Sequence, residues 1–385
     1  MSPEYGTLTV GNVVIGATED ILAPPDEMLL AFFPDDSFLW NDIGIPTMAE
    51  ADSRIVKDRM DILGYDLPAA HNAVRQWLND DYLEHLRQEL FPAIELEDLR
   101  PEALTELVMR SLTTTDIGSN LRSLQVFVPP DYMLRIALEA SPDSVVTAVF
   151  DEEVKGLLGP LPSPSTSRLE RSRTDALFGV PAIVLTEGKT DSEFLHGSFK
   201  LLYPHLVDLV RFFEYELRPE GGASALVTTV KAFASAGVAN RIIALFDNDT
   251  AATEPLQNLD ISKLPPNIKV LKYPPVELGR RYPTLGPPSG ESGPAVDVNE
   301  LAGSIELYLG QNVLVQADGT LTPVQWKSFN VRLKRYQGEV TNKAAIHERF
   351  RAKLAFAKEN GLTEDQDWTG LHLVLDAVLD LLRTN

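Results

Sequence analysis

Two short apolar runs that end in acidic residues constrain the fold of this chain more than any other feature. PAIVL, at 181–185, and RIIALF, at 241–246, are continuous or nearly continuous apolar stretches, which are typical of strands buried on both faces. Glu187 follows the first run, and Asp247 and Asp249 follow the second. Because helix-like segments separate such runs, the sequence predicts right-handed strand–helix–strand units and an open, Rossmann-like parallel α/β sheet.

The segments around these runs fit the same pattern. Further strands are expected at 209–217 and 267–274, with helices beginning near Lys189 and, after a Gly-Gly pair, at Ser224. Ligands of open parallel sheets gather at the carboxyl ends of the strands. Glu187 and the Asp pair are therefore expected to converge there, and Asp191, one helical turn beyond Glu187, is expected to face the same cleft.

This cluster of acids predicts a divalent-metal site. Carboxylates that crowd together repel one another unless a cation offsets them, and Mg²⁺, or Mn²⁺, prefers such oxygen ligands. We expect Asp191, Asp247 and Asp249 to bind metal and Glu187 to act as a ligand or as a general acid or base. A D-x-D after a strand also has a plain structural interpretation, since Asp commonly forms turns or caps helices.

The glycines at 221 and 222 follow the middle strand and open a helix. Free N–H groups at such a helix start suit a phosphate, so Gly221 and Gly222 are candidate phosphate-binding residues. The alternative is that a Gly-Gly pair simply bends the loop.

The chain divides by composition into four parts. Residues 1–155 predict a mainly α (α+β) domain with a β-like start and helical periodicity from about Thr47 to Leu90. The Pro-, Gly- and Ser-rich stretch within 156–175 predicts a linker. Residues 176–275 hold the parallel α/β domain, and 276–385 predict a loop followed by a mostly helical C-terminal extension.

The net charge of the chain limits how it can bind nucleic acid. The formal net charge is −22 over 385 residues, whereas generic nucleic-acid binders are usually basic. Nucleic acid would have to be held through a local basic strip, a bound metal or a separate partner subunit. The simpler interpretation is that acidity keeps a cytoplasmic protein soluble. With no cysteine, any metal must use oxygen or imidazole ligands, and no long apolar run or signal-like N-terminus predicts a membrane association.

The α/β segment resembles the Toprim domain, which topoisomerases, bacterial primases, recombination proteins and overcoming-lysogenization-defect (OLD) type nucleases share. The matching residues are TEGKTDSEFL at 186–195 and LFDNDTAA at 245–252. The resemblance implies that Glu187, Asp247 and Asp249 are the functional acids of metal-dependent strand cleavage, transfer or synthesis. Asp191 and the glycines are more similar to the nuclease branch.

The whole chain also resembles the bacterial proteins described as HEPN/Toprim-associated. YGTLTVGNVVIG at the start, RRYPTLGP at 280–287, GSIELYLG at 303–310 and YQGEVTNK at 336–343 carry this likeness. The OLD-type resemblance implies a further acid at a second metal site and an assisting lysine. Glu306 is the candidate acid, with Glu300 and Asp297 behind it. Lys343 is the candidate lysine, with Lys327 and Lys334 as open alternatives.

Several other activities lack the residues they need. HEPN ribonucleases use an Arg four to six residues before a His, and none of the six histidines has an Arg placed that way before it. His85 and His347 are better explained as surface helix residues. No feature selects a tyrosine nucleophile, no thiolate zinc site can form, and no Walker lysine motif is present, so an ATPase partner would be a separate chain.

The favoured hypothesis is a Mg²⁺-dependent endonuclease for DNA or RNA, acting alone, as a homo-oligomer or with a partner subunit. The resemblance alone suggests a role in defence against phage. The rival hypothesis is a non-catalytic Toprim scaffold that recognises nucleic acid or a protein, which the heavy negative charge favours.

Overall fold

The protein forms two compact units, which are described separately here. The computed structural model divides into Met1–Val180 with Arg383–Asn385 (unit 1) and Pro181–Leu382 (unit 2). The residues described are 6–17, 28–78, 100–113, 128–151, 155, 181–213, 221–286 and 295–383. The predicted linker at 156–175 lies outside the described residues. Unit 2 contains both the predicted α/β domain and the predicted C-terminal extension.

Unit 1 is built on a five-stranded antiparallel sheet in the order β2-β1-β5-β4-β3. The strands are β1 (Thr7–Val10), β2 (Val13–Ala17), β3 (Phe38–Trp40), β4 (Pro46–Asp52) and β5 (Val145–Val149). Alternate residues of β1 are buried, Leu8 and Val10 among them, as expected for a sheet with one face on the core. The β-like start predicted from the sequence is thus one edge of a larger sheet.

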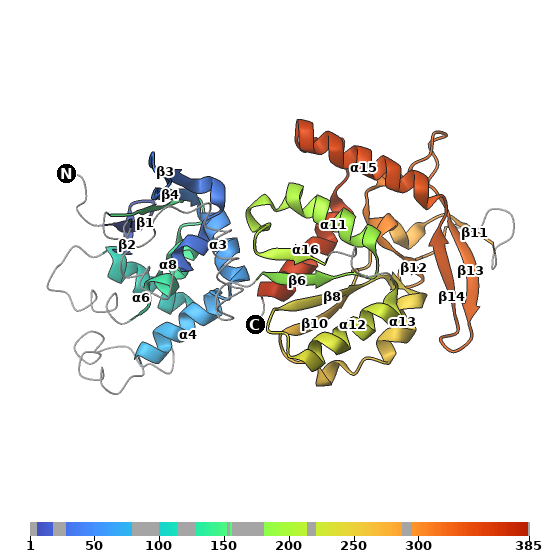
Figure 1. Ribbon diagram of the computed structural model, residues 1–385, viewed down its shortest axis with the longest axis horizontal. Helices are drawn as coiled ribbons and strands as arrows, with labels where there is room; N and C mark the ends of the chain where they lie inside the picture. The colour runs from blue at the N-terminus through green and yellow to red at the C-terminus, as the bar shows by residue number, and fades with distance from the viewer. Residues whose placement is uncertain are drawn as a thin grey trace. The chain divides into compact units, whose positions relative to one another are not determined.

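In the described residues of unit 1, five α-helices pack with this sheet around one apolar core (Figure 1). They are α2 (Met28–Phe32), α3 (Ser53–Ile62), α4 (Leu67–Leu78), α6 (Pro101–Thr113) and α8 (Pro130–Ala140). The helix expected to begin near Thr47 begins instead at Ser53, where the Asp52 side chain accepts a hydrogen bond from the Arg54 N–H. Pairing of β4 with strands on both sides outweighs the weak local helix preference of this segment.

The centre of unit 2 is a four-stranded parallel sheet, as the sequence predicts, and the structure gives the strand order β10-β8-β6-β7. Its strands are β6 (Ala182–Leu185), β7 (Val210–Phe212), β8 (Ile242–Phe246) and β10 (Ile268–Lys272). The strands β6 and β8 are direct neighbours, with Leu185 opposite Ala244. The segments that follow these two strands therefore leave the sheet side by side.

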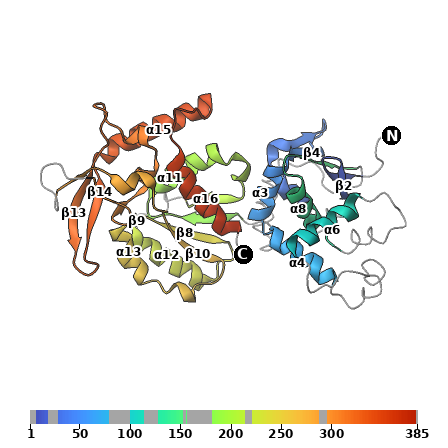
Figure 2. The ribbon, with the colours of Figure 1, turned by 180° about the vertical axis from the view of Figure 1, so that it is seen from behind.

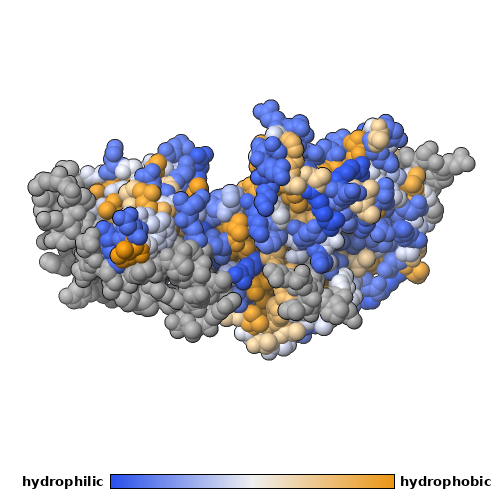
Figure 3. All heavy atoms as spheres, turned by 45° about the horizontal axis from the view of Figure 1, so that its top comes forward, coloured by the Kyte–Doolittle hydropathy of each residue, from blue (hydrophilic) through white to orange (hydrophobic). Residues whose placement is uncertain are grey.

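Helices cover both faces of the parallel sheet (Figure 1). The helices α12 (Ala223–Ala236) and α13 (Thr250–Gln257) lie on one face and enclose a buried apolar cluster that includes Phe246. On the other face lie α11 (Lys189–Leu202) and α16 (Thr369–Arg383), seen from behind in Figure 2. On the side displayed in Figure 3, the described surface of unit 2 is mostly hydrophilic with scattered apolar residues.

The rest of unit 2 is less helical than the sequence predicts. A three-stranded sheet forms from β11 (Thr284–Leu285), β13 (Val324–Asn330) and β14 (Arg335–Val340), and the pair β13–β14 is an antiparallel hairpin. A two-residue strand β12 (Ala302–Gly303) pairs with β9 (Asn248–Asp249). The prediction of a mostly helical extension is wrong for the hairpin, although Val324 and Trp326 alternate as a half-buried strand should.

Two further helices and several short 3₁₀ turns complete the described part of the chain. The helices are α14 (Gln311–Leu314) and α15 (Lys343–Asn360). The 3₁₀ turns are η1 (Asp35–Ser37), η5 (Pro204–Leu206), η7 (Ile261–Lys263), η8 (Glu277–Arg281) and η9 (Ile305–Tyr308). The sequence pattern at 299–310 predicts a short helix, but this segment contains instead the strand β12 and the turn η9, which is shorter and tighter than an α-helix.

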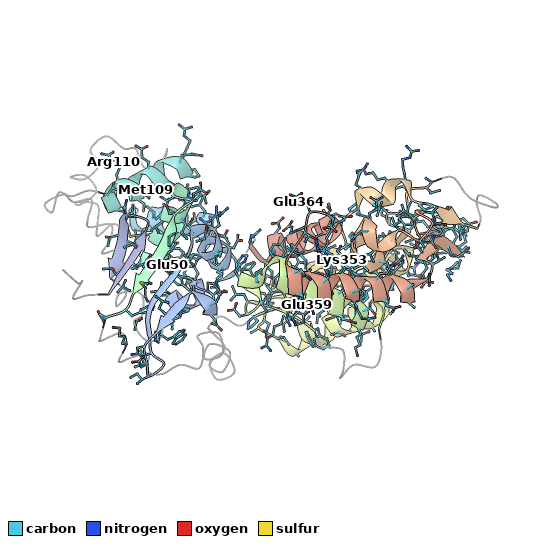
Figure 4. All side chains as sticks on the ribbon, turned by 90° about the horizontal axis from the view of Figure 1, so that it is seen from above. Glu50, Met109, Arg110, Lys353, Glu359 and Glu364 are labelled. Atoms are coloured by element: carbon cyan, nitrogen blue, oxygen red, sulfur yellow. The ribbon has the colours of Figure 1, made fainter. Side chains whose placement is uncertain are left out.

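A buried lysine fixes α15 to the loops beside it. Lys353, labelled in Figure 4, is 6% exposed, and its Nζ donates to the carbonyls of Leu309 and Asp367. The same ammonium lies 4.2 Å from the ring centroid of Trp368. Burial lowers the pKa of Lys353 to about 8. Three satisfied contacts of this kind explain how a charged side chain is tolerated inside unit 2.

A close approach at Gly303 gives a first testable prediction. A Cβ at this position would lie 2.4 Å from the Asn248 carbonyl oxygen, which is backbone and cannot rotate away. We expect Gly303→Ala to lower the free energy of unfolding by about 2 kcal/mol or more, because β9 and β12 must separate. Urea unfolding would measure this. Gly16→Ala is the control, since its Cβ would meet only ordinary contact at 3.9 Å; equal losses in the two variants would contradict the prediction.

Candidate metal centre

Glu187 and the D-x-D segment meet at the carboxyl ends of β6 and β8. The Asp247 N–H donates a 2.9 Å hydrogen bond to Glu187 Oε1 across 60 positions of sequence. The predicted convergence of the two acidic segments is confirmed by this contact. It arises because the parallel neighbours β6 and β8 end at the same edge of the sheet.

Asp191 joins the same group of acids from the first turn of α11. The residue is 8% exposed and lies close to the turn that begins the helix. A Cβ on Gly188 would lie 3.0 Å from Asp191 Oδ2, so glycine at 188 leaves the room this carboxylate needs. The Ser192 hydroxyl donates to the Phe213 carbonyl at 2.8 Å and ties the turn to the end of β7. Asp191 is thereby held inside the site.

The electrostatics show how tightly these acids are packed. Burial, with the charges of Asp249 and Asp191, raises the pKa of Glu187 to about 7. Burial and the charge of Glu306 raise the pKa of Asp191 to about 7. Burial and the charges of Asp191 and Glu187 raise the pKa of Asp247 well above its usual range. Carboxylates that resist ionisation in this way are destabilised until a cation or a proton joins them.

One oxygen of Asp247 has no partner in the described part of the chain. Asp247 is half-buried as a residue, yet its Oδ1 is enclosed and receives no hydrogen bond from the residues described. A buried acceptor without a donor costs about 1–3 kcal/mol, and more when it is charged. Together with the raised pKa values, this oxygen fits a divalent cation, for which carboxylates are the natural ligands.

Asp249, a candidate metal ligand, also caps a helix. Its Oδ1 accepts the Ala252 N–H at 2.8 Å and so caps α13, and its Oδ2 accepts the Gln337 amide at 2.9 Å. Asp249 is 6% exposed. The capping interpretation of the D-x-D is therefore confirmed for Asp249, and any metal contact would have to use its remaining lone pairs.

Glu306 lies beside the cluster and has three partners of its own. It accepts from His347 Nε2 at 2.8 Å and from the Ser304 hydroxyl at 2.5 Å, and it pairs with Lys343 Nζ at 3.4 Å. Burial acts to raise the pKa of Glu306, but the His347 hydrogen bond and the Lys343 charge outweigh burial and lower it to about 2. The candidate second-site acid is thus an ion-paired carboxylate whose charge also reaches Asp191.

His347 was expected as a surface helix residue; it lies on α15 but is partly buried. Its side chain is 18% exposed, contacts Glu306 and packs edge-on against Phe194 with ring centroids 5.2 Å apart. The signal was available in the sequence, because His347 lies four residues beyond Lys343 and shares its helix face. The sequence does not show that α15 faces the acids, so the spacing alone could not assign His347 to the site.

The other lysine and acid candidates lie elsewhere. Lys343 reaches the cluster, whereas Lys327 pairs with Glu339 on the hairpin and Lys334 lies in the hairpin turn with φ 53°. Glu300 pairs with Arg335, and Asp297 accepts from Asn299 in a local turn. Among the alternatives that the sequence left open, these contacts favour Lys343 and Glu306.

Lys272 is a basic residue of the site that the sequence analysis missed. It ends β10, beside β8, and its charge acts on Glu187 and Asp249. Burial lowers the pKa of Lys272, which those acids oppose. Its position at the carboxyl end of a fourth parallel strand was the signal that could have identified it.

The glycines predicted to bind phosphate have a defined local role. The Gly222 N–H donates to the Glu187 carbonyl at 2.7 Å, and a Cβ on Gly221 would lie 3.1 Å from that same oxygen. Gly222 also has φ 91°, a conformation that favours glycine. The pair therefore holds the backbone of Glu187. Phosphate binding by Gly221 and Gly222 stays a prediction, and one N–H it would use is already engaged.

Some expectations have no support beyond these contacts. Among the described residues, no group of three or more His, Asp or Glu side chains is already spaced to hold a metal ion. Comparison with protein-family models, with curated proteins and with solved structures gave no match for this chain. The Toprim and HEPN/Toprim-associated assignments therefore stay predictions. No helix in the described ranges is long and apolar enough to span a membrane.

The raised pKa values predict an unusual response of stability to pH. An acid with a folded-state pKa of about 7 and an unfolded value near 4 keeps its proton only in the folded protein. Its contribution to stability is complete below about pH 4 and is lost as pH rises through 7. In chelator, we expect Asp191→Asn to raise the free energy of unfolding by about 2 kcal/mol at pH 8 and by less at pH 5.

Thermal and urea unfolding at the two pH values would measure this difference. Asp365→Asn is the matched control, because Asp365 is exposed and far along the chain from the acids. A loss of stability in Asp191→Asn at pH 8 would show that this carboxylate is not under electrostatic strain.

Proposed function

We propose that unit 2 is a divalent-metal-dependent nuclease that cleaves phosphodiester bonds in DNA or RNA. The observation that carries this proposal is the meeting of Glu187, Asp191 and Asp247 at adjacent strand ends, with pKa values raised and Asp247 Oδ1 unpartnered within the described residues. Strongly perturbed acids that gather at one point are typical of functional sites.

The donor set suits Mg²⁺ or Mn²⁺. Asp191 and Asp247 are the proposed metal-holding residues, and Asp249 and Glu306 would add charge at the two sides of the group. When bound, such an ion would stabilise the negative charge that develops on a phosphate oxygen. The carboxylates proposed to hold the ion offer oxygen ligands, in agreement with the preference of these hard cations.

Glu187 and Lys343 are the residues proposed to act on substrate. With a pKa of about 7, the Glu187 carboxylate can accept a proton from water or return one near neutral pH. The hydrogen bond from the Asp247 N–H fixes the direction of its Oε1. Lys343, 33% exposed in its side chain, would neutralise a phosphate while Glu306 keeps it in place.

The sequence resemblance supports the same proposal independently of the contacts. TEGKTDSEFL and LFDNDTAA are similar to the functional segments of Toprim enzymes, most closely of OLD-type nucleases. Membership of the HEPN/Toprim-associated proteins, a cytoplasmic location, work as a homo-oligomer or with a partner subunit, and a part in anti-phage defence belong to this proposal. They rest on the resemblance alone.

A non-catalytic scaffold is the second candidate. The net charge of −22 favours it, as do the commitments of Asp249 to helix capping and of Glu306 to an ion pair. In this version the acids would stabilise a fold that recognises a partner, and no phosphodiester bond would be cleaved.

Cleavage assays decide between the two. Purified chain with Mg²⁺ or Mn²⁺ is expected to cut plasmid or single-stranded DNA or RNA. Asp247→Asn and Glu187→Gln should each lower the rate about 100-fold or more, because one removes the negative charge of the enclosed metal ligand and the other the proton acceptor. Asp365→Asn is the control at an exposed site. Cleavage that persists unchanged in Asp247→Asn would reject the site, and its absence in every metal and substrate would favour the scaffold.

Metal binding has a readout of its own. An ion held by the folded chain should stabilise it by roughly 2.7 kcal/mol when its concentration exceeds Kd about 100-fold. We expect Mg²⁺ or Mn²⁺ to raise the melting temperature of the wild type at pH 8 and to have much less effect on Asp247→Asn. The same rise in both proteins would place the ion somewhere other than at Asp247.

A further inference from the structure

The β13–β14 hairpin reverses the charge of the chain locally. Between Gly319 and Gly338 there is no acidic residue, and four basic residues occur: Lys327, Arg332, Lys334 and Arg335. The hairpin itself, at 324–340, has these four basic residues and one acid, Glu339, which pairs with Lys327, so it keeps a net positive charge in a chain whose net charge is −22. Figures 1 and 2 show the hairpin projecting from the edge of unit 2, so that these charges lie on an extended arm.

The arm also exposes apolar and aromatic side chains. Phe329 is 48% exposed and Val331 is 79% exposed. Phe329 lies opposite Tyr336 in the strand register, with ring centroids 5.0 Å apart, and Tyr336 in turn lies 6.1 Å from the ring of Trp326. The three rings form a row from the buried base of the hairpin to its exposed tip. An exposed ring at the end of a supported row is a ready surface for stacking.

The base of the arm is bonded to the acidic site. The Thr250 hydroxyl donates to the Tyr336 carbonyl at 2.7 Å, and the Ala251 N–H donates to Gln337 Oε1 at 2.7 Å. The amide of Gln337 donates to Asp249 Oδ2 at 2.9 Å. The base of the aromatic row therefore lies next to the D-x-D segment. A nucleic-acid strand bound along the arm would end near these carboxylates.

The basic side chains of the arm are only lightly committed. Arg332 pairs with Glu254 and Arg335 with Glu300, with 63% and 42% of the arginine side chains exposed. Exposed ion pairs of this kind contribute little to stability, so a phosphate can replace the carboxylate. Lys334 has no carboxylate partner among the residues that the structure describes.

We propose that the β13–β14 hairpin is an arm that binds single-stranded nucleic acid, with Phe329 stacking on an unpaired base and Arg332 and Lys334 contacting phosphates. This inference deepens the proposed function, because it names the substrate class that reaches the acidic site. Binding to the arm does not require the metal. Unpaired bases are selected because their faces are free for an aromatic ring, whereas those of a duplex are stacked.

Binding is tested with the full chain in chelator, so that no substrate is consumed. The probes are fluorescently labelled oligothymidine, oligouridine and a duplex of the same length, titrated at several salt concentrations. The wild type should bind the single strands more tightly than the duplex. Comparison of the affinities for oligothymidine and oligouridine shows whether the arm prefers DNA or RNA.

Two pairs of variants test the contacts. Phe329→Ala should weaken single-strand binding about five-fold or more, whereas Phe356→Ala, which removes a ring of the same 48% exposure from α15, should not. The double variant Arg332→Ala/Lys334→Ala should lower the salt slope by about 1.4, as expected for two phosphate contacts. Lys263→Ala/Arg280→Ala removes two exposed charges elsewhere in unit 2 and should leave the slope unchanged.

Equal affinities and slopes in the arm and control variants would overturn the proposal, as would a wild type that prefers the duplex. Cleavage is scored separately. Arm variants that lose binding while the wild type never cleaves would support the arm and reject the nuclease. Cleavage that depends on Asp247 but is unaffected by Phe329→Ala and by loss of the two cations would support the nuclease and reject the arm.

Discussion

The parallel pairing of β6 with β8 is the constraint on which the candidate site depends. It places Glu187 against the Asp247 N–H and encloses both carboxyl groups at one sheet edge. The energy for this arrangement comes from burial of the two strands and of the helices over them, because the acids themselves repel. The sheet thus holds together groups that would separate in water, which is how folds prepare binding sites for cations.

A second set of contacts limits that repulsion. Glu306 contacts three polar side chains, those of Lys343, His347 and Ser304. The charge of Lys272, at the end of β10, acts on Glu187. The positive partners therefore act mainly on one acid. They lower the pKa of Glu306 to about 2, while the pKa of Asp191 rises to about 7. A bound cation would therefore stabilise the site most at Asp191 and Asp247, whose pKa values are raised.

Local pattern and long-range contact account for what the sequence could predict. The parallel sheet was accessible because PAIVL and IIALF are continuous apolar runs separated by helix-like segments, whereas the order of the strands needed the structure. The hairpin β13–β14 pairs locally, and the alternation at Val324 and Trp326 could have indicated it. The strand β4 was not accessible, because it also pairs with β5, which is distant in sequence. For the same reason, Glu187, Asp191 and Asp247 could be named from residues that follow strands, whereas His347 and Lys272 needed the fold to show what they face.

The contrast between an acidic chain and a cationic arm has a consequence for selectivity. At physiological salt the Debye length is about 8 Å, so the net charge of −22 is screened at a distance while Arg332 and Lys334 still act on a phosphate in contact. A duplex lying broadly against unit 2 would bring many phosphates close to carboxylates. A single strand following a narrow projecting hairpin would meet mainly its cations and Phe329. In the proposed nuclease, the net negative charge of the chain therefore favours binding along the arm, whose Gln337 donates a hydrogen bond to Asp249 and so joins the arm to the site.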